Sequence, residues 1–196
     1  TTLRYNMTTI QETLSFQHFN LEQFITDKLT KQGIQEPTEI QKKAIPVAMS
    51  NQDILGSAET GSGKTIAFAA PIVHRLYQNP QSRAVIIAPT RELADQIAKN
   101  MRRLTPEKIS IALLIGGAPM FKQLQQLRKS PQIIVGTPGR MIDHLNRGKL
   151  NMQKTSILVL DETDRMLDMG FSEQINELLD ETPTERQTML FSATMP

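Results

Sequence analysis

The stretch of sequence with the clearest chemistry is residues 58–65, which read Ala-Glu-Thr-Gly-Ser-Gly-Lys-Thr after a short apolar run. The two glycines of this loop allow a tight turn whose backbone N–H groups point at phosphate oxygens. Lys64 offers a positive charge to the β- and γ-phosphates, and the Thr65 hydroxyl is a ligand that Mg²⁺ accepts. The loop predicts a nucleoside-triphosphate site, although Ala58 stands where the general pattern has glycine.

An acidic pair further along the chain offers groups for a metal ion and a water molecule. Asp161 and Glu162 follow four consecutive apolar residues, which suit a strand buried on both faces of a parallel sheet. The pair would then lie at the carboxyl end of a strand, where open α/β sheets bind their ligands. Asp161 would hold Mg²⁺ through water, and Glu162 would orient or deprotonate the attacking water. The alternative is an acidic helix N-cap after a core strand.

The elements that must position these groups alternate along the chain. Short runs rich in Ile, Val and Leu predict strands at residues 53–57, 84–88, 109–115, 132–136, 156–160 and 188–191. Helical patterns lie between them. One helix is predicted with Asn20 as its N-cap and Gly33 as its stop, and Pro138 suits the first turn of another. The alternation predicts an α/β domain, in which a mostly parallel sheet carries helices on both faces.

Seven motifs in order resemble those of the first RecA-like domain of DEAD-box RNA helicases, and the resemblance covers about residues 16–196. In chain order the motifs are residues 33–41 with the isolated aromatic Phe16 upstream, 58–65, 89–94, 116–117, 137–140, 161–164 and 192–194. The resemblance implies a RecA-like P-loop fold and an ATP-dependent RNA helicase. It also implies ATP and Mg²⁺ as cofactors, and RNA bound through its sugar-phosphate backbone without sequence preference.

The resemblance assigns roles to individual residues. Nucleotide contacts fall on Phe16, Gln41, Ala58, Glu59, Thr60, Gly61, Ser62, Gly63, Lys64 and Thr65. Mg²⁺ would contact Thr65 and, through water, Asp161. Catalytic roles fall on Lys64, Asp161, Glu162, Ser192 and Thr194. RNA contacts fall on Thr90, Arg91, Gly117, Thr137 and Arg140. Asp164 would couple the acidic motif to the hydroxyls of Ser192 and Thr194. The alternative for Arg91 is an ion pair with Asp95, four residues later on the same helix.

Two residues depart from the pattern of the resembled family. Thr163 stands where the family has alanine, which adds a hydroxyl and a β-branch beside the metal site without removing either acidic group. Ile34 stands where an aromatic residue is usual, so we expect adenine to pack on an aliphatic surface and to bind weakly. Gln41 offers one donor and one acceptor, which match the edge of adenine.

The net charge of +2 hides an uneven distribution of charge along the chain. Residues 83–154 hold 13 Lys and Arg against 4 Asp and Glu, a net charge of +9, whereas residues 155–196 hold 2 against 9, a net charge of −7. A basic segment of this kind is typical of a surface that binds a polyanion, with solvated helix faces as the alternative. The chain has two Tyr and no Trp, which favours contact with the nucleic-acid backbone over base stacking.

Composition argues against several other classes of protein. Without Cys the chain can form neither a disulfide framework nor a thiolate metal site, and His18, His74 and His144 match no metal-binding spacing. The sequence contains no apolar run of membrane-spanning length and no signal peptide. We therefore expect no membrane association and a cytoplasmic location, with the nucleus as the alternative.

The predicted organisation is one domain at residues 16–196 after a flexible lead-in at residues 1–15. The resemblance implies a second RecA-like domain, absent from this sequence, which would supply arginine fingers and the other half of the RNA groove. Two other functions stay open. One is a DNA translocase or another two-domain ATPase that uses the same loop, and the other is a binding protein that has lost hydrolysis, with Thr163 as its mark.

Overall fold

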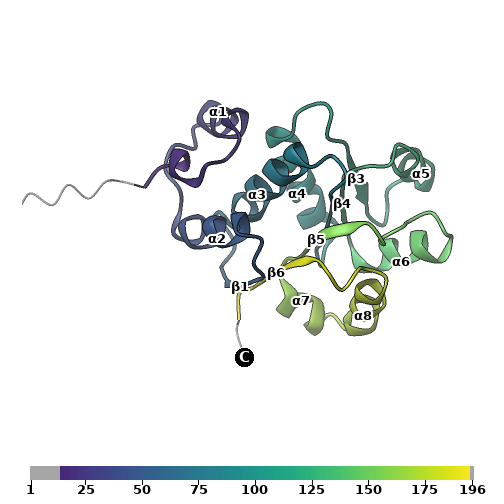
Figure 1. Cartoon of the computed structure of the whole chain (residues 1–196). Helices are drawn as coiled ribbons and strands as arrows, with labels where there is room; N and C mark the ends of the chain where they lie inside the picture. The colour runs from purple at the N-terminus through teal and green to yellow at the C-terminus, as the bar shows by residue number, and fades with distance from the viewer. Residues whose placement is uncertain (1–13, 195–196) are drawn as a thin grey trace, which may run out of the picture.

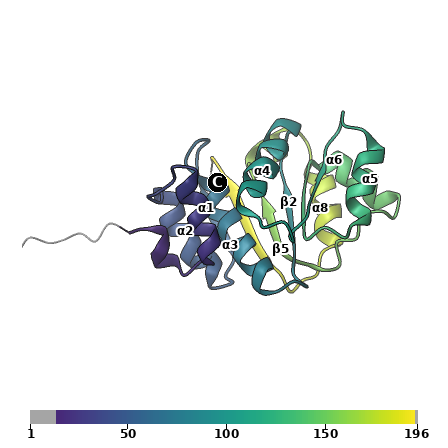
Figure 2. The ribbon, with the colours of Figure 1, turned by 90° about the horizontal axis from the view of Figure 1, so that it is seen from above.

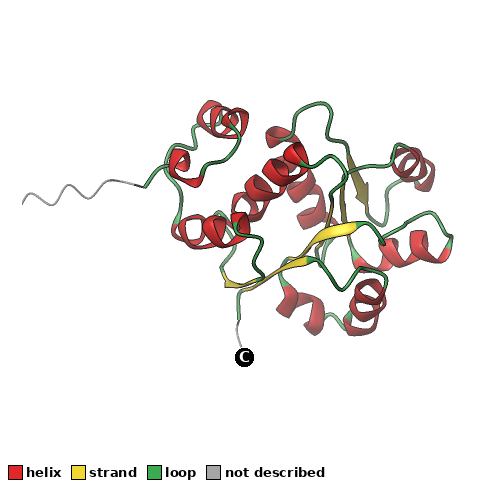
Figure 3. Ribbon diagram, in the orientation of Figure 1, coloured by secondary structure: helices red, strands yellow, loops and turns green. Residues whose placement is uncertain are grey.

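A computed structural model describes residues 14–194, so the lead-in predicted at residues 1–15 lies outside the described residues except for Leu14 and Ser15. In the described part of the chain, strands and helices alternate (Figure 1). They form three layers, with helices on both sides of one central sheet (Figure 3). The predicted α/β class is confirmed.

The six strands of the sheet are all parallel. Their order across the sheet is β1 (Ile54–Ser57), β6 (Gln187–Ser192), β5 (Thr155–Leu160), β2 (Arg83–Ile87), β4 (Ile133–Gly136) and β3 (Ile111–Leu114). The six predicted strands are therefore confirmed, with ends that differ by at most two residues. Because every strand points the same way, all six carboxyl ends meet at one edge of the sheet, and the turns that follow them share that edge.

Alternate residues of the central strands face opposite sides of the sheet, as the pleat requires. Ala84 and Ile86 belong to a hydrophobic cluster that also includes residues of η1 (Phe16–Phe19), α1 (Gln23–Lys31), α2 (Glu39–Met49), α3 (Lys64–Gln78) and α4 (Arg91–Leu104). Val85 and Ile87 pack with α6 (Pro138–Asn146), α7 (Thr163–Asp168) and α8 (Ser172–Asp180). Figure 2 shows these two helical layers on either side of the sheet. The remaining helix, α5 (Met120–Arg128), lies beside the edge strand β3.

The boundaries of the first helix correct one sequence prediction. Gly33, with φ of 77°, follows the end of α1 as predicted, but Asn20 is not the N-cap. Asn20 adopts the left-handed conformation, with φ of 57°, and ends η1, whereas α1 begins at Gln23 with Glu22 as its N-cap. The reason is that Asn, unlike most residues, tolerates the left-handed region and so suits a turn as well as a cap. Pro138 is the first residue of α6, as predicted.

The lengths and compositions of the helices also bear on membranes. Within residues 14–194, none of the helices combines the length and the apolar character that crossing a bilayer requires.

Candidate functional site

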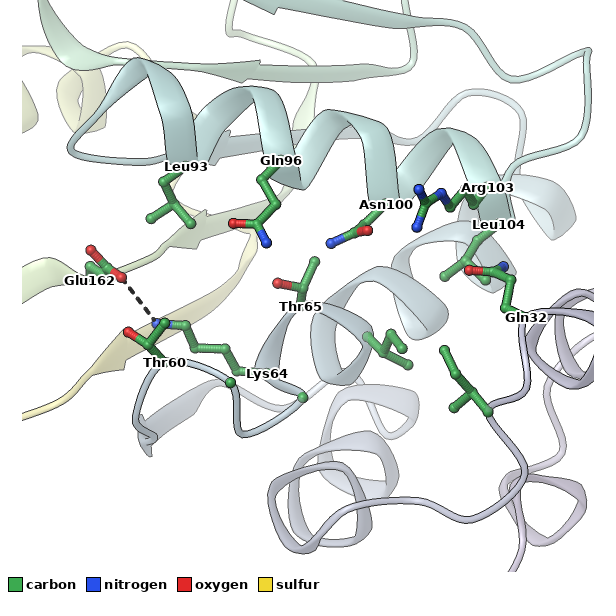
Figure 4. A pocket seen from close by; sticks show the side chains of 14 residues that line it. Gln32, Thr60, Lys64, Thr65, Leu93, Gln96, Asn100, Arg103, Leu104 and Glu162 are labelled. Atoms are coloured by element: carbon green, nitrogen blue, oxygen red, sulfur yellow. Dashed lines mark ion pairs between the residues drawn. The ribbon is translucent and has the colours of Figure 1, made fainter.

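A cleft of about 300 Å³ opens where the loop at residues 58–65 turns into α3. Figure 4 shows that its lining comes from this phosphate loop, from α3 and α4, from the turn after β5 and from the segment after α1, which contributes Gln32 and Ile34. We call the cleft the phosphate pocket. Among the predicted site residues, its lining includes Thr60, Gly61, Gly63, Lys64, Thr65 and Glu162. The structure therefore brings the loop and one member of the acidic pair together.

Lys64 lies between the phosphate loop and the acidic pair. It is the first residue of α3 and is only 6% exposed. Its Nζ lies 3.0 Å from Asp161 Oδ1 and 3.7 Å from Glu162 Oε1, and Figure 4 marks the second of these ion pairs. The loop turns tightly enough because Gly61 and Gly63 adopt φ angles of 82° and 87°, a region that glycine occupies without strain. The ammonium group thus pairs with both carboxylates of the acidic pair and lies where it could also contact a phosphate.

Glu162 holds an unusual backbone conformation at the start of α7. Its φ and ψ are both 52°, in the left-handed region, which costs a non-glycine residue roughly 1–3 kcal/mol. Two contacts stabilise the turn: the Glu162 N–H donates to Asp161 Oδ1 at 2.9 Å, and Arg165 Nη1 donates to Glu162 Oε2 at 3.3 Å. A strained backbone conformation beside a cleft indicates that the direction of the Glu162 carboxylate matters for function.

The acidic pair fits a metal ion that is held largely by water and phosphate. Asp161 is fully buried, and its Oδ2 has no hydrogen-bond partner among the described residues. Burial raises the pKa of Asp161, against the opposing charge of Lys64. Residues 14–194 hold no cluster of three or more His, Cys, Asp or Glu side chains that could cage an ion. Mg²⁺ usually keeps several waters and takes one or two carboxylates plus phosphate oxygens, which suits this donor set.

Two predicted nucleotide contacts, Phe16 and Gln41, do not line the phosphate pocket. Phe16 is buried and packs edge-on against Phe19, with ring centroids 5.9 Å apart. Gln41 is 1% exposed, and its Oε1 accepts from the Thr38 N–H at 2.9 Å while its Nε2 donates to the Gly63 carbonyl at 3.0 Å. Gln41 thus ties α2 to the phosphate loop, and its contact with adenine stays a prediction.

The other residues of the phosphate loop, Ala58, Glu59 and Ser62, do not line the phosphate pocket. The Ala58 N–H donates to the Ser192 carbonyl at 3.1 Å, which extends the pairing of β1 with β6 by one residue. Glu59 is exposed, and its carbonyl accepts from the Ser62 N–H at 3.2 Å. The Ser62 hydroxyl is buried without a partner in the described part of the chain. These three residues shape the loop, and their contacts with a nucleotide stay predictions.

A polar row on α4 also lines the phosphate pocket and was not predicted from the sequence. Gln96, Asn100 and Arg103 line the phosphate pocket, and their spacing of four and three residues places them on one face of the helix. In Figure 4 this row faces Thr65, with Arg103 at the end farthest from Lys64. The spacing was visible in the sequence, but a polar row on a helix is more often a solvated face.

Asp164 joins the acidic motif to the end of β6. Thr194 donates its hydroxyl at 2.9 Å and its N–H at 3.1 Å to Asp164 Oδ2, so the predicted bond is present for Thr194. The Ser192 hydroxyl donates instead to the Thr194 carbonyl at 2.7 Å. Slight burial raises the pKa of Asp164, but the hydrogen bonds from Thr194 outweigh it and hold the pKa below its usual value. The carboxylate is thus stabilised in its charged form.

Thr163 adds a further tie between the acidic motif and β6. Its hydroxyl lies 3.2 Å from the Phe191 carbonyl and 3.4 Å from the Leu160 carbonyl, to either of which it can donate. An alanine could make neither bond. The residue does not line the phosphate pocket, and both partners of its hydroxyl are backbone groups.

We expect Thr163→Ala to weaken the fold slightly and to leave nucleotide binding unchanged. The lost hydrogen bond should lower the free energy of unfolding by about 0.5–1.5 kcal/mol. Urea denaturation and calorimetry with Mg-ADP would measure the two effects. Thr163→Ser, which keeps the hydroxyl, serves as the control and should stay near the parent stability. A tenfold loss of affinity in Thr163→Ala alone would contradict this account, because it would place the hydroxyl in the binding site (a tenfold loss is about 1.4 kcal/mol).

A second hollow, of about 480 Å³, lies at the same edge of the sheet beyond the ends of β2, β4 and β3. We call it the polar groove. Its lining includes four of the five predicted RNA contacts, namely Thr90, Arg91, Thr137 and Arg140, and also Gly116. The fifth, Gly117, follows directly in the chain. Three motifs that are far apart in sequence therefore meet in one hollow because their strands are neighbours in the sheet.

Arg91 lies against the glycine doublet rather than along its own helix. The alternative ion pair with Asp95 is not formed, since Asp95 pairs with Lys99 at 2.7 Å instead. The Arg91 guanidinium occupies the space that a Cβ at Gly117 would need, and the φ of 75° at this residue also favours glycine. The doublet thus allows the arginine to reach the groove.

Arg140 and two apolar residues complete the polar groove. Arg140 Nη1 donates to the Ala118 carbonyl at 3.2 Å, and its Nε lies 3.6 Å from the Asp143 carboxylate. Met169, which is exposed, and Phe171 line the same groove and were not predicted. They follow the acidic motif at a turn, where the sequence offers no periodic signal.

Comparisons with known proteins agree with this geometry. A family profile described as DEAD/DEAH box helicase matches residues 38–196. An ATP-dependent RNA helicase CshA of Listeria monocytogenes is 45% identical over 183 residues, which are 92% of this chain and 35% of that protein. A DEAD-box ATP-dependent RNA helicase CshA of Bacillus subtilis is 44% identical over 186 residues, 94% of this chain and 38% of that protein. The chain therefore spans little more than a third of the length of these relatives.

A solved structure shares the fold. A DEAD box protein from the hyperthermophile Methanococcus jannaschii superposes with a TM-score of 0.87 at 40% sequence identity, over 93% of this chain and 50% of that chain.

Proposed function

Because the chain belongs to the DEAD/DEAH box helicase family, we propose that it is the ATP-binding, RNA-contacting RecA-like domain of an ATP-dependent RNA helicase. The single observation that carries the proposal is the placement of two hollows at one edge of the sheet. One holds Lys64 and Glu162, and the other holds Arg91 and Arg140. A polyanionic strand and a triphosphate could therefore bind side by side.

In this proposal the phosphate pocket holds ATP. The N–H groups of the loop at residues 58–65 and the positive end of α3 receive the phosphates, together with the Lys64 ammonium. Thr65 and, through water, Asp161 would hold Mg²⁺, which supplies positive charge to the phosphate oxygens when it is bound. Glu162 would accept a proton from the attacking water or orient it. The unpartnered Asp161 Oδ2 and the direction of the Glu162 carboxylate support these roles.

The polar groove is proposed to bind the sugar-phosphate backbone of RNA. Hydroxyl, glycine N–H and guanidinium groups gather there, and these are the groups that contact phosphates without reading sequence. The net charge of +9 on residues 83–154 supports the same assignment. Asp164, bonded to Thr194 at the end of β6, would couple the acidic motif to the edge of the sheet that faces the second domain.

A second RecA-like domain is proposed as the partner that completes both sites. The relatives are nearly three times as long as the matched segment, which leaves room for such a domain. Of the residues that line the phosphate pocket in the described chain, Lys64 and Arg103 are cationic. Lys64 is already paired with carboxylates, so a further positive charge for the γ-phosphate would have to come from outside. Local unwinding of RNA or remodelling of RNA–protein complexes would require both domains.

We expect the chain to bind ADP more tightly than GDP by about tenfold. Gln41 has one N–H and one lone pair beyond its present bonds. On the base edge that carries N7, adenine presents a matching donor and acceptor, whereas guanine presents two acceptors. Because Gln41 is buried and Ile34 replaces an aromatic residue, the affinity should be weak. Isothermal calorimetry with Mg-ADP and Mg-GDP measures the ratio directly.

Two variants sharpen this measurement. Gln41→Met keeps the length of the side chain and should bring the ratio of the two affinities towards one, while the lost tie to Gly63 lowers both affinities. Lys64→Ala should abolish both, because the loop loses its cation. Equal affinities for ADP and GDP in the unmodified chain would contradict the adenine-reading role of Gln41.

A further inference from the structure

Two polar side chains are buried beneath the polar groove, and neither lines it. His144 of α6 is 0% exposed and Gln123 of α5 is 2% exposed. His144 Nε2 lies 2.8 Å from Gln123 Oε1, and Gln123 Nε2 donates to the Ile115 carbonyl at 2.8 Å. Ile115 immediately precedes the glycine doublet of the groove. The chain of hydrogen bonds therefore runs from the helix that carries Arg140 to the loop that carries Gly117.

The directions of these hydrogen bonds fix the protonation of His144. The Ile115 carbonyl can only accept, so the Gln123 amide N–H must face it and the amide oxygen must face the imidazole. His144 Nε2 is therefore protonated, and Nδ1 carries no proton in the neutral ring. Burial lowers the pKa of His144, and the charges of Arg140 and Arg147 lower it further against that of Asp143. The ring is thus held as a neutral donor.

The loop of the glycine doublet is held at three successive points. Before the doublet, the Ile115 carbonyl accepts from Gln123. At the doublet, the Arg91 guanidinium packs on Gly117. After it, the Ala118 carbonyl accepts from Arg140 at 3.2 Å. The first of these contacts comes from a buried side chain, since Gln123 is 2% exposed, and removing one partner of a buried polar group leaves unsatisfied atoms and can shift the backbone.

His144 and Arg140 lie four residues apart on one face of α6, so a shift of the helix at His144 would also shift Arg140. A displacement of His144 would carry the Arg140 guanidinium with it, and a displacement of Gln123 would carry the glycine doublet. The buried contact between His144 and Gln123 therefore sets the distance between the two walls of the polar groove, one carrying Arg140 and the other the glycine doublet. The phosphate pocket depends on other elements, chiefly the phosphate loop, α3 and α4.

We propose that His144 and Gln123 form a positioning pair that sets the spacing between the glycine doublet and Arg140, and thereby the affinity of the polar groove for the RNA backbone. Neither residue touches RNA. The inference rests on the proposed RNA-binding function, and it adds to that function two residues outside the groove.

The test measures RNA affinity and nucleotide affinity in the same variants of this chain. The probe is a single-stranded oligouridylate followed by fluorescence anisotropy at low salt, and Mg-ADP binding is followed by calorimetry. His144→Leu and Gln123→Met remove the polar contact and keep side-chain bulk. We expect each to weaken RNA binding about fivefold to tenfold, the effect of one lost buried hydrogen bond, with ADP affinity unchanged. His144→Gln, which can still donate to the Gln123 oxygen, should recover most of the affinity.

A matched control separates positioning from a general loss of stability. His74 is a half-buried histidine on the other side of the sheet, where its Nδ1 accepts from the Glu22 N–H, so His74→Leu should change RNA affinity little. If His144→Leu fails to fold, Gln123→Met carries the test alone. Folded Gln123→Met with parent RNA affinity, or a parallel loss of ADP affinity in His144→Leu, would overturn the proposal.

Nuclear magnetic resonance gives a result that does not depend on RNA. The ¹⁵N shifts of the His144 ring should place the proton on Nε2, and the backbone amides of Gly116 and Gly117 should shift in Gln123→Met but not in His74→Leu. A proton on His144 Nδ1, or unchanged chemical shifts of the Gly116 and Gly117 amides in Gln123→Met, would contradict the positioning role of the pair. If the unmodified chain binds no oligouridylate, the proposed function fails, and these signals still decide whether the pair positions the loop.

Discussion

Glu162→Gln should leave ATP binding intact and reduce turnover by about 10²–10⁴-fold in a protein that joins this chain to the proposed second domain. The amide cannot accept the proton of the attacking water. The Glu162 side chain lines the phosphate pocket beside Lys64, whereas the neighbouring carboxylate of Asp161 is fully buried and does not line the pocket. Calorimetry with ATP and a steady-state assay of phosphate release measure the two effects.

The control for this prediction is an exposed glutamate elsewhere. Glu173 lies on α8 and is exposed, so Glu173→Gln should leave both binding and turnover unchanged. If Glu162→Gln hydrolysed ATP at the parent rate, another group would activate the water and the assignment would be wrong. A loss of ATP affinity in Glu162→Gln would instead mean that the carboxylate is needed to hold Lys64 in place.

The sheet and the two hollows at its edge could be predicted because both follow from local sequence. A strand buried on two faces must be an unbroken apolar run, and the runs of β2, β4 and β5 each lead within three residues to a polar or charged side chain. Once the strands are parallel, the topology alone brings Lys64 close to Asp161 and Arg91 close to Thr137. The phosphate loop and the acidic pair therefore met as expected.

What could not be predicted depends on contacts between residues that are distant in sequence. Gln41 has the donor and acceptor that adenine needs, but its side chain is buried and donates to the Gly63 carbonyl, 22 residues away. His144 and Gln123 are 21 residues apart, and each alone reads as an ordinary helix residue. Asn20 suits both a cap and a left-handed turn, and only the packing of η1 decides between them.

The second large effect concerns the chain by itself. We expect it to bind nucleotide and, weakly, single-stranded RNA, but to hydrolyse ATP negligibly and to unwind nothing. Phosphoryl transfer needs positive charge on the γ-phosphate, and an arginine finger supplies a factor on the order of 10³–10⁵. Lys64 is shared with two carboxylates, and in Figure 4 Arg103 lies at the opposite end of the pocket. RNA binding through phosphates alone should also weaken steeply with salt.

Closure of two domains around ATP and RNA would complete both sites at once, because the phosphate pocket and the polar groove lie at the same edge of the sheet. Joining the second domain should therefore restore hydrolysis only when RNA is present. The Lys64→Ala variant of the joined protein should hydrolyse no ATP with or without RNA, and it therefore controls for contaminating ATPase.

Steady-state ATP hydrolysis with and without single-stranded RNA, measured on this chain and on the protein that carries both domains, tests the central claim most directly. The account predicts negligible, RNA-independent turnover by the chain, and RNA-dependent turnover faster by about 10³–10⁵-fold when the second domain is present. RNA-dependent turnover by the 196-residue chain alone, in preparations whose Lys64→Ala variant is silent, would contradict it.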